Sequence, residues 1–270
     1  MEIIKTDFKD IDISIQLRSD GFSFCILDKD SKESIVVQDC LFENENITPQ
    51  KQLDFFVNQF ETNELLKNSF TKVNVTHSNN LSTFVPLPFF NEDNLSEYLQ
   101  YNLKVLENEF IAYDTIESAE MINVYIPFVH LNNYLFDRFG SFDYKHSSSV
   151  LVETLLKETL ANDKTHFFVN VETGIFQIVV LKNKKMKFFN TFNFKTKEDF
   201  IYYILFTAEQ LNLNPEEFQL TLLGDIEKES ELYDIIYKYI KNIHFFLPNY
   251  MLSKDLLISN HSHFTLLNQH

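Results

Sequence analysis

Short segments of alternating apolar and polar residues open the chain. The alternation covers Asp12–Arg18, Phe22–Asp28 and Glu33–Phe42, and short polar turns separate the three segments. A period of two is typical of β-strands, and tight turns between such strands predict an antiparallel meander. After Pro49 the apolar residues recur with a helical period, which predicts a helix over 49–67. The chain therefore opens with three strands and a helix.

The remainder of the first half mixes strand and helix patterns. The loop residues Pro86-Leu87-Pro88 and Gly140 interrupt it. We predict strands over 72–77, 121–126 and 142–145, and helices over 91–106, 127–139 and 147–160.

The second half repeats the opening pattern. Alternating segments cover Thr165–Val171, Ile175–Leu181 and Lys185–Phe194, which predicts a second three-stranded meander. A capping-box pattern, Thr196 to Asp199, begins a predicted helix over 196–213. Further on we predict strands over 219–223 and 242–247, and helices over 228–241 and 253–257.

Both halves thus follow the order strand, strand, strand, helix, strand, helix, strand. Gly21 and Gly174 fall at what we interpret as the same point of the first hairpin in each half. This correspondence predicts an internal duplication, with a first lobe over residues 1–161 and a second lobe over residues 162–270.

Composition limits the class of protein. Of the 270 residues, 44% are hydrophobic and 23% charged, so the chain can bury a core and is not intrinsically disordered. It contains only 4 Gly but 29 Phe and 12 Tyr, a bias that an AT-rich genome produces. The formal net charge of -16 repels phosphate backbones and anionic lipid, so we expect no nucleic acid partner.

Three features of the sequence predict a cytoplasmic location. They are the N-terminus, the longest apolar stretch and the cysteines. Residues 1–7 lack the basic and apolar pattern of a signal peptide, and Phe200–Ala208 is about half the ~20 residues that a membrane helix requires. Cys25 and Cys40 lie in apolar segments without metal-ligand spacing, which is typical of free thiols in a reducing compartment. We expect a cytoplasmic protein with no membrane span.

The duplicated strand and helix order resembles the superfamily of actin, sugar kinases and heat-shock chaperones. Within it, residues 168–180, the basic hairpin that follows and the segment 194–205 are similar to the actin-like platform proteins of type IV pilus and type II secretion machinery. Residues 20–24 and 222–224 resemble an uncharacterised family of Bacteroidetes proteins of unknown function. The resemblance implies an α/β fold of two actin-like, ribonuclease H-like lobes, each with the order βββαβαβ, around a central cleft.

The same resemblance implies where a nucleotide would bind. In active relatives the first hairpin of each lobe carries an Asp that orders a metal and a Gly whose backbone approaches phosphate. The matching positions hold Gln16 and Arg18 in the first lobe and Asn170 and Glu172 in the second. The glycine pair that binds adenosine is reduced to Gly224. The positions of this degenerate cleft are Gln16, Arg18, Gly21, Asn170, Glu172, Gly174 and Gly224.

These replacements favour a protein without nucleotide chemistry. We expect no catalytic residue, no cofactor and no metal, and we interpret the chain as a protein-interaction or scaffold module in which Arg18 and Glu172 approach each other across the cleft. The alternative is a divergent ATP-binding enzyme, a kinase or an ATPase, that uses Asp12, Asp20 or Asp225 for its metal. A third class is a self-assembling structural protein.

Two other groups of residues have simple interpretations. His261 and His263 could share a metal, but no third ligand has suitable spacing, so we expect a solvated tail. Ser147-Ser148-Ser149 precedes a predicted helix, where a serine N-cap is a simpler explanation than a nucleophile. The sequence contains no nucleophile-elbow, P-loop or dinucleotide-binding motif.

Binding surfaces are indicated by lysines and aromatic doublets. The lysine cluster from Lys182 to Lys187 is either a solvated hairpin tip or a contact for an acidic partner. Doublets such as Phe89-Phe90 and Phe188-Phe189 place rings on opposite faces of a strand or at adjacent helix positions, so some rings are exposed. We expect an unidentified protein partner or self-association.

Overall fold

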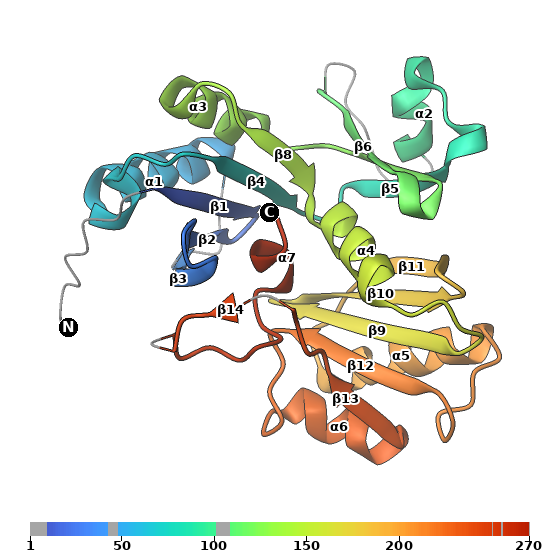
Figure 1. Ribbon diagram of the computed structural model, residues 1–270. Coiled ribbons are helices and arrows are strands. Elements are labelled where there is room, and N and C mark those ends of the chain that lie inside the picture. The colour runs from blue at the N-terminus through green and yellow to red at the C-terminus, as the bar shows by residue number, and fades with distance from the viewer. Residues whose placement is uncertain (1–9, 43–47, 101–108, 250, 255, 270) are drawn as a thin grey trace.

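Two large β-sheets and one small sheet organise the protein (Figure 1). The computed structural model describes residues 10–42, 48–100, 109–249, 251–254 and 256–269. The strand orders are β14-β3-β2-β1-β4-β8 in the first sheet, β11-β10-β9-β12-β13 in the second and β5-β7-β6 in the small one.

The first sheet contains the predicted meander. β1, β2 and β3 pair antiparallel, and the following strand β4 pairs parallel with β1, as does β8 with β4. Its strands and the helices of this half are β1 (Ile11–Arg18), β2 (Gly21–Asp28), β3 (Glu33–Leu41), α1 (Pro49–Thr62), β4 (Val73–Ser78), α3 (Val129–Phe139), β8 (Asp143–His146) and α4 (Ser147–Glu158).

A small sheet interrupts this half between β4 and α3. It comprises β5 (Ser82–Pro86), β6 (Ala112–Ile116) and β7 (Met121–Tyr125), and helix α2 (Leu95–Gln100) packs against it. Only β7 and the helix were predicted from the sequence. The small sheet is therefore an insertion in the first half that the duplication does not account for.

The second sheet confirms the predicted repeat of meander, helix, strand, helix and strand. The Thr196 hydroxyl accepts a hydrogen bond from Asp199 N–H, and the Asp199 carboxylate accepts one from Thr196 N–H. The two bonds form the predicted capping box. The elements are β9 (Thr165–Glu172), β10 (Ile175–Lys182), β11 (Lys185–Asn193), α5 (Lys197–Gln210), β12 (Gln219–Gly224), α6 (Glu231–Tyr239) and β13 (Asn242–Phe245).

Several predicted helix limits are wrong. The helix predicted over 49–67 ends at Thr62, because the Asn63 side chain accepts a hydrogen bond from Leu65 N–H and starts a separate 3-10 turn. The helix predicted over 91–106 begins as a 3-10 turn, and residues 101–108 lie outside the described residues. The helix predicted over 253–257 is wrong: strand β14 (Met251–Leu252) pairs with β3, and the last helix is α7 (Phe264–Leu267).

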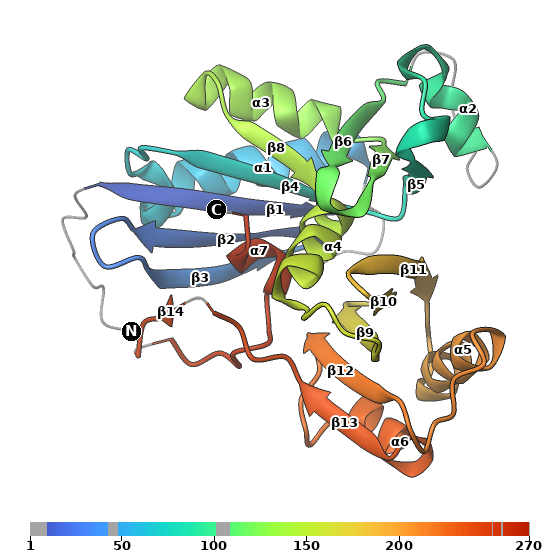
Figure 2. The ribbon, with the colours of Figure 1, turned by 45° about the vertical axis from the view of Figure 1, so that its right-hand side comes forward.

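Separate apolar cores lie on the outer faces of the two large sheets. Alternate residues of β1, including Ile13 and Ile15, pack with α1 and α3, and the corresponding face of β9 and β10 packs with α5 and α6. Helices α4 and α7 lie between the two sheets (Figure 2). The end of the chain thus contacts the first sheet, and the lobe division at residue 161 stays a prediction.

Candidate functional site

Two hairpins bring the predicted cleft residues together. Arg18 pairs with Gly21 at the end of β1, and Glu172 pairs with Ile175 at the end of β9, so both residues immediately precede a two-residue turn. Gln16 and Asn170 lie two residues earlier on the same strands, on the same face as Arg18 and Glu172. The structure thus places four residues from two distant segments around one cavity.

The cavity at this junction is small. Its volume is about 10 Å³, which is about the space that one water molecule needs. The lining residues are Gln16, Arg18, Asn170, Val171, Glu172, Gly224, Asp225, His263, Phe264 and Thr265. Side chains therefore fill most of the space between the two hairpins.

Glu172 is the most buried carboxyl group of the junction. The Ser78 hydroxyl donates to its Oε2 at 2.8 Å, and the Asn170 side-chain N–H donates to its Oε1 at 3.4 Å. Burial raises the pKa of Glu172, while the Ser78 hydrogen bond and the charge of Arg18 act in the opposite direction. A buried carboxyl group at this point repels a phosphate whenever it is ionised.

Arg18 lines the same cavity as Glu172, but its ion pairs are formed with other residues. Its Nε lies 3.1 Å from Asp20 Oδ1, and its Nη2 lies 3.8 Å from Asp39 Oδ1. Asp225 adds an exposed carboxylate at the rim. Glu172 and Asp225 also lie within the influence of Arg18, and desolvation by the surrounding protein raises the pKa of both, so carboxyl groups outnumber the guanidinium at this junction.

The C-terminal segment supplies the side chains that fill the junction. Thr265 Oγ1 donates to Gln16 Oε1 at 2.7 Å on the first sheet, and Gly224 N–H donates to the His261 carbonyl oxygen at 2.8 Å on the second. Phe264, 1% exposed, packs in a core that contains residues of α4, β9, β10 and β12. Helix α7 therefore joins the two sheets by both polar and apolar contacts.

Close backbone contacts explain two of the retained glycines. A Cβ at Gly224 would lie 2.1 Å from the Val171 carbonyl oxygen, and one at Gly21 would lie 2.2 Å from the Cys40 carbonyl oxygen. The predicted equivalence of Gly21 and Gly174 is wrong by one residue, because Gly21 begins β2 whereas Gly174 lies within the turn before β10. Equivalent hairpin positions are thus defined by Arg18 and Glu172.

Two of the three alternative metal-binding aspartates lie near Arg18, and the third, Asp12, does not. Asp12 precedes Arg18 by six residues on β1, a distance of about 20 Å along an extended strand, and does not line the cavity. Asp20 pairs with Arg18, and only Asp225 of the three contributes to the lining. The described residues hold no cluster of three or more potential metal-ligating side chains.

The other sequence candidates have structural roles. His261 Nε2 lies 2.6 Å from the Ile226 carbonyl oxygen, and His263 Nε2 lies 3.7 Å from Asp39 Oδ2, so neither belongs to a solvated tail as predicted. The predicted serine N-cap of α4 is also wrong. The cap is His146, whose Nδ1 accepts from Ser148 N–H.

A buried polar cluster beside α4 was not predicted. Asp114 accepts hydrogen bonds from the Tyr125 hydroxyl at 3.1 Å and from His146 N–H at 2.8 Å, and burial raises its pKa. Burial lowers the pKa values of His77 and His146 to about 3, so both rings are neutral. Because all four side chains are buried, the cluster connects β4, β6, β7 and the end of β8 rather than offering a surface site.

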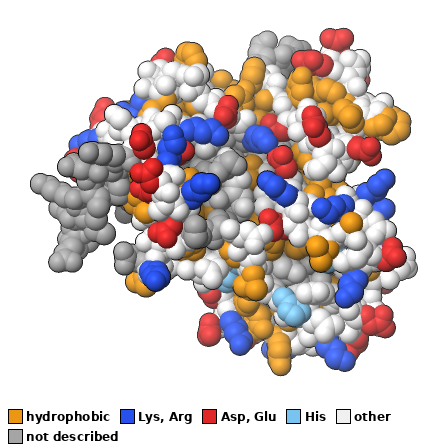
Figure 3. Space-filling view, in the orientation of Figure 1, with side chains coloured by type: hydrophobic (Ala, Val, Ile, Leu, Met, Phe, Trp, Pro, Cys, Tyr) orange, Lys and Arg blue, Asp and Glu red, His pale blue; other side chains and the backbone are white. Residues whose placement is uncertain are grey.

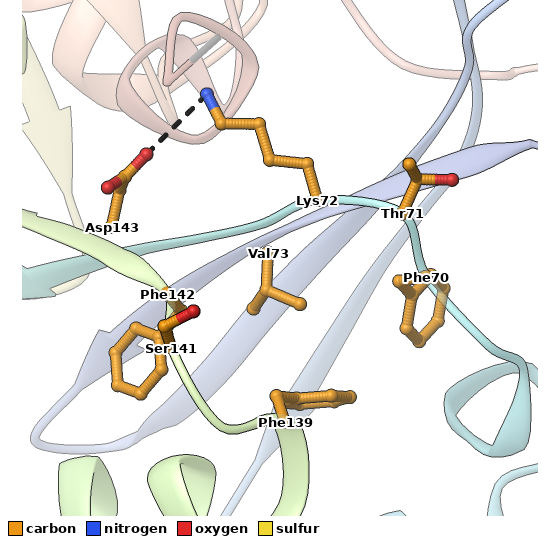
Figure 4. A pocket seen from close by; sticks show the side chains of 8 residues that line it. All are labelled: Phe70, Thr71, Lys72, Val73, Phe139, Ser141, Phe142 and Asp143. Atoms are coloured by element: carbon orange, nitrogen blue, oxygen red, sulfur yellow. Dashed lines mark ion pairs between the residues drawn. The ribbon is translucent and has the colours of Figure 1, made fainter.

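A larger cavity lies away from the hairpin junction, where β4 begins (Figure 4). Its volume is about 320 Å³, and Phe70, Phe139 and Phe142 contribute aromatic rings to its wall. Its ion pair, between Lys72 Nζ and Asp143 Oδ2 at 3.8 Å, is solvent-exposed.

The two sheets, their crossing helices and the hairpins at the junction define an actin-like fold. A Bacteroides thetaiotaomicron protein described as having an actin-like ATPase fold and unknown function is similar, with a TM-score of 0.76 and 22% identity over 91% of this chain and 94% of that chain. The chain belongs to the family described as "Protein of unknown function (DUF3822)", whose model matches residues 2–243. The expected resemblances of fold and family are confirmed.

A second similar structure is the PilM–PilN type IV pilus biogenesis complex. Its TM-score is 0.64, with 10% identity over 95% of this chain and 96% of that chain. A comparison with curated protein sequences gives no significant match. None of the helices in the described part of the chain has the length and apolar character that a bilayer crossing requires.

Proposed function

We propose that this protein is a non-catalytic interaction or scaffold module whose nucleotide cleft is degenerate. The observation that carries the proposal is the cavity of about 10 Å³ at the hairpin junction. A nucleotide needs a site of several hundred cubic ångströms. Thr265 and Phe264 occupy the junction from the same chain, so a nucleotide would have to displace helix α7.

Charge supports the same proposal. Asp20, Asp39, Glu172 and Asp225 gather around Arg18, and neither first hairpin has a glycine at the phosphate-facing position. Phosphate sites use backbone N–H groups and cations, and here a carboxyl group takes that position in the second lobe. In the alternative, an ATP-binding enzyme, Asp225 would have to hold the metal. Strand β1 would supply no second carboxylate for that metal, because its residues that line the cavity are Gln16 and Arg18.

An interaction role is supported by the fold comparison and by exposed rings. The similar PilM structure is a complex with another protein, PilN. Phe89, Phe136, Tyr202 and Tyr237 are each more than half exposed, and exposed aromatic rings are typical of protein interfaces. Two buried cysteines that are free thiols support a reducing, cytoplasmic location for this module.

Isothermal titration calorimetry with Mg-ATP and Mg-ADP tests the proposal. We expect no binding heat and no release of phosphate from ATP, with circular dichroism as the control that the protein is folded. Micromolar affinity for either nucleotide would overturn the proposal. Loss of that affinity in Asp225→Asn would then identify the divergent ATP-binding enzyme.

A further inference from the structure

Strand β11 presents an open edge. It is the last strand of the second sheet, and the Thr191 N–H donates to the neighbouring Asn190 side chain at 2.9 Å. Phe194 N–H, by contrast, donates to Gly174, on the β10 side. Because backbone groups alternate along a strand, the N–H groups of residues 189, 191 and 193 turn away from β10.

A polar cavity lies beside this open edge. Its volume is about 420 Å³, and it is lined by Asn80, Ser82, Thr83, Phe84, Phe189, Asn190 and Thr191. The second wall belongs to β5, the edge strand of the small sheet, where the Leu81 carbonyl oxygen accepts from Ile126 N–H. Ser82 therefore turns its backbone groups toward the free side. Hydroxyl, carboxamide and backbone groups converge there, with no charged side chain in the lining.

Four lysines continue the same edge toward the β10–β11 hairpin. The side chains of Lys182, Lys184, Lys185 and Lys187 are exposed, and none forms an ion pair with a residue in the described part of the chain. The polar contact at this tip joins Asn183 to Asp163 at 3.0 Å. Lys and Arg side chains gather on the right-hand side of the face in Figure 3, at the height of β10 and β11.

The charge of these lysines indicates which kind of molecule binds at the β11 edge: a second copy of this chain, a nucleic acid or another polypeptide. A second copy of β11 in parallel pairing would set the same lysines against one another, so that arrangement is repelled. A nucleic acid has no strand backbone to pair with this edge, and the cavity offers it no cation. An extended acidic polypeptide can pair with the lysines and offers a backbone that can bond the groups of β11 that turn away from β10.

We propose that the β11 edge binds an extended acidic segment of a partner protein, which adds to the second sheet as a further strand and places hydroxyl or carboxamide side chains in the cavity beside β5. The strand is nine residues long and would accept a segment of similar length. This inference rests on the proposed interaction role and names the surface and the partner chemistry for it.

Fluorescence polarisation with a designed peptide tests the inference on the full chain. The probe is a labelled nonapeptide of alternating glutamate with valine or threonine. The controls carry lysine in place of glutamate, or proline at the central positions. We expect saturable binding of the acidic probe alone, weakened about threefold or more between 50 and 300 mM salt. Hydrogen exchange should slow in residues 185–193.

Two sets of variants separate backbone from charge recognition. Thr191→Pro removes an outward N–H and should weaken binding about tenfold, whereas Thr191→Ala keeps the N–H and should leave affinity within about threefold. Replacing Lys184, Lys185 and Lys187 together by Gln should also weaken binding about tenfold. The matched control replaces the exposed Lys228, Lys238 and Lys254 and should change little. If Thr191→Pro does not fold, the comparison of the two triple-lysine variants still tests the inference.

The outcomes distinguish this inference from the proposed function. Three results would overturn the inference. The acidic probe does not bind, the lysine probe binds equally well, or both triple-lysine variants lose the same affinity for the acidic probe. Preferential binding of a single-stranded oligonucleotide, or concentration-dependent dimers that the β11 lysine variant strengthens, would overturn it as well. Binding of Mg-ATP overturns the proposed function instead, whatever the peptide does.

Discussion

Gly224 and Gly174 provide a matched test of which glycines the fold itself requires. Their φ angles are similar, 83° and 74°, so alanine introduces the same backbone strain at both positions. A Cβ at Gly224 would also lie 2.1 Å from the Val171 carbonyl oxygen and 2.8 Å from Asn170 Oδ1, whereas a Cβ at Gly174 would meet no atom within 4 Å. The two substitutions therefore differ in overlap alone.

The expected magnitudes follow from these contacts. A left-handed backbone costs an L-residue about 1 to 2 kcal/mol, so Gly174→Ala should lower the free energy of unfolding by about that amount. At Gly224 the overlap forces β9 and β12 apart, and overpacking costs a further ~1 to 3 kcal/mol. Gly224→Ala should therefore lose about 2 to 5 kcal/mol.

Urea unfolding at pH 7, followed by circular dichroism because the chain has no tryptophan, measures both losses. The wild type and both variants should show equal m-values. Equal losses for the two variants would refute the overlap argument. Two other outcomes would show instead that Gly224 contacts a nucleotide. Either Mg-ATP restores the stability of Gly224→Ala, or the wild type binds a nucleotide and Gly224→Ala does not.

Three further substitutions test the junction and the buried cluster, each by urea midpoint. Phe264→Ala should cost about 3 to 5 kcal/mol, because this ring is 1% exposed and packs between the sheets; a loss under 1 kcal/mol would contradict this packing. Glu172→Gln should stabilise the protein more at pH 8 than at pH 5, since burial raises the pKa of the carboxyl and ionisation then opposes folding; destabilisation at pH 8 would show that the Arg18 charge dominates. His146 has a folded pKa of about 3, below its ordinary value of 6.5, so its contribution is present above pH 6.5 and lost as the pH falls toward 3. Asparagine can still cap α4, so His146→Asn should keep the cap. The free energy of unfolding of this variant, relative to wild type, should rise by about 2 to 3 kcal/mol between pH 7 and pH 4.5. If the stability of both proteins changes equally with pH, the lowered pKa of His146 is contradicted.

The sequence predicted the meanders because their alternating residues match the two faces of a sheet. In β6 the same rule failed, because the inward positions alternate as Ala112, Asp114 and Ile116, and a buried aspartate does not read as a core residue. Asp114 is buried with hydrogen-bond partners from Tyr125 and His146, both distant in sequence. Such tertiary partners leave no local signal.

Helix α7 shows the same limit at the C-terminus. A helix was predicted over 253–257, yet Leu257 is 99% exposed, whereas Phe264 to Leu267 are all buried and helical. The residue before α7, His263, has φ of 49° and provides no side-chain cap. Packing between the two sheets, rather than capping or periodicity, determines where this helix forms.

The candidate site was predicted in part. The resemblance to actin-like proteins placed Gln16, Arg18, Asn170 and Glu172 at equivalent hairpin positions, and the structure brings all four to one cavity. The hydrogen bond between Thr265 and Gln16 spans 249 residues of sequence, so the filling of the junction by the C-terminal segment could not be predicted. The open edge of β11 likewise depends on sheet order, which the strand pattern alone does not specify.

Backbone conformation sharpens the meaning of the missing glycines. Among the described residues, seven other than glycine have positive φ, including Lys32, Asn183 and Asn212, so this chain places other residues as well as glycine in left-handed backbone. Glycine persists at Gly21 and Gly224, where a Cβ would overlap a carbonyl oxygen. A bound phosphate would impose the same close approach at positions 18 and 172. Arginine and glutamate at these positions therefore agree with the proposed absence of nucleotide binding.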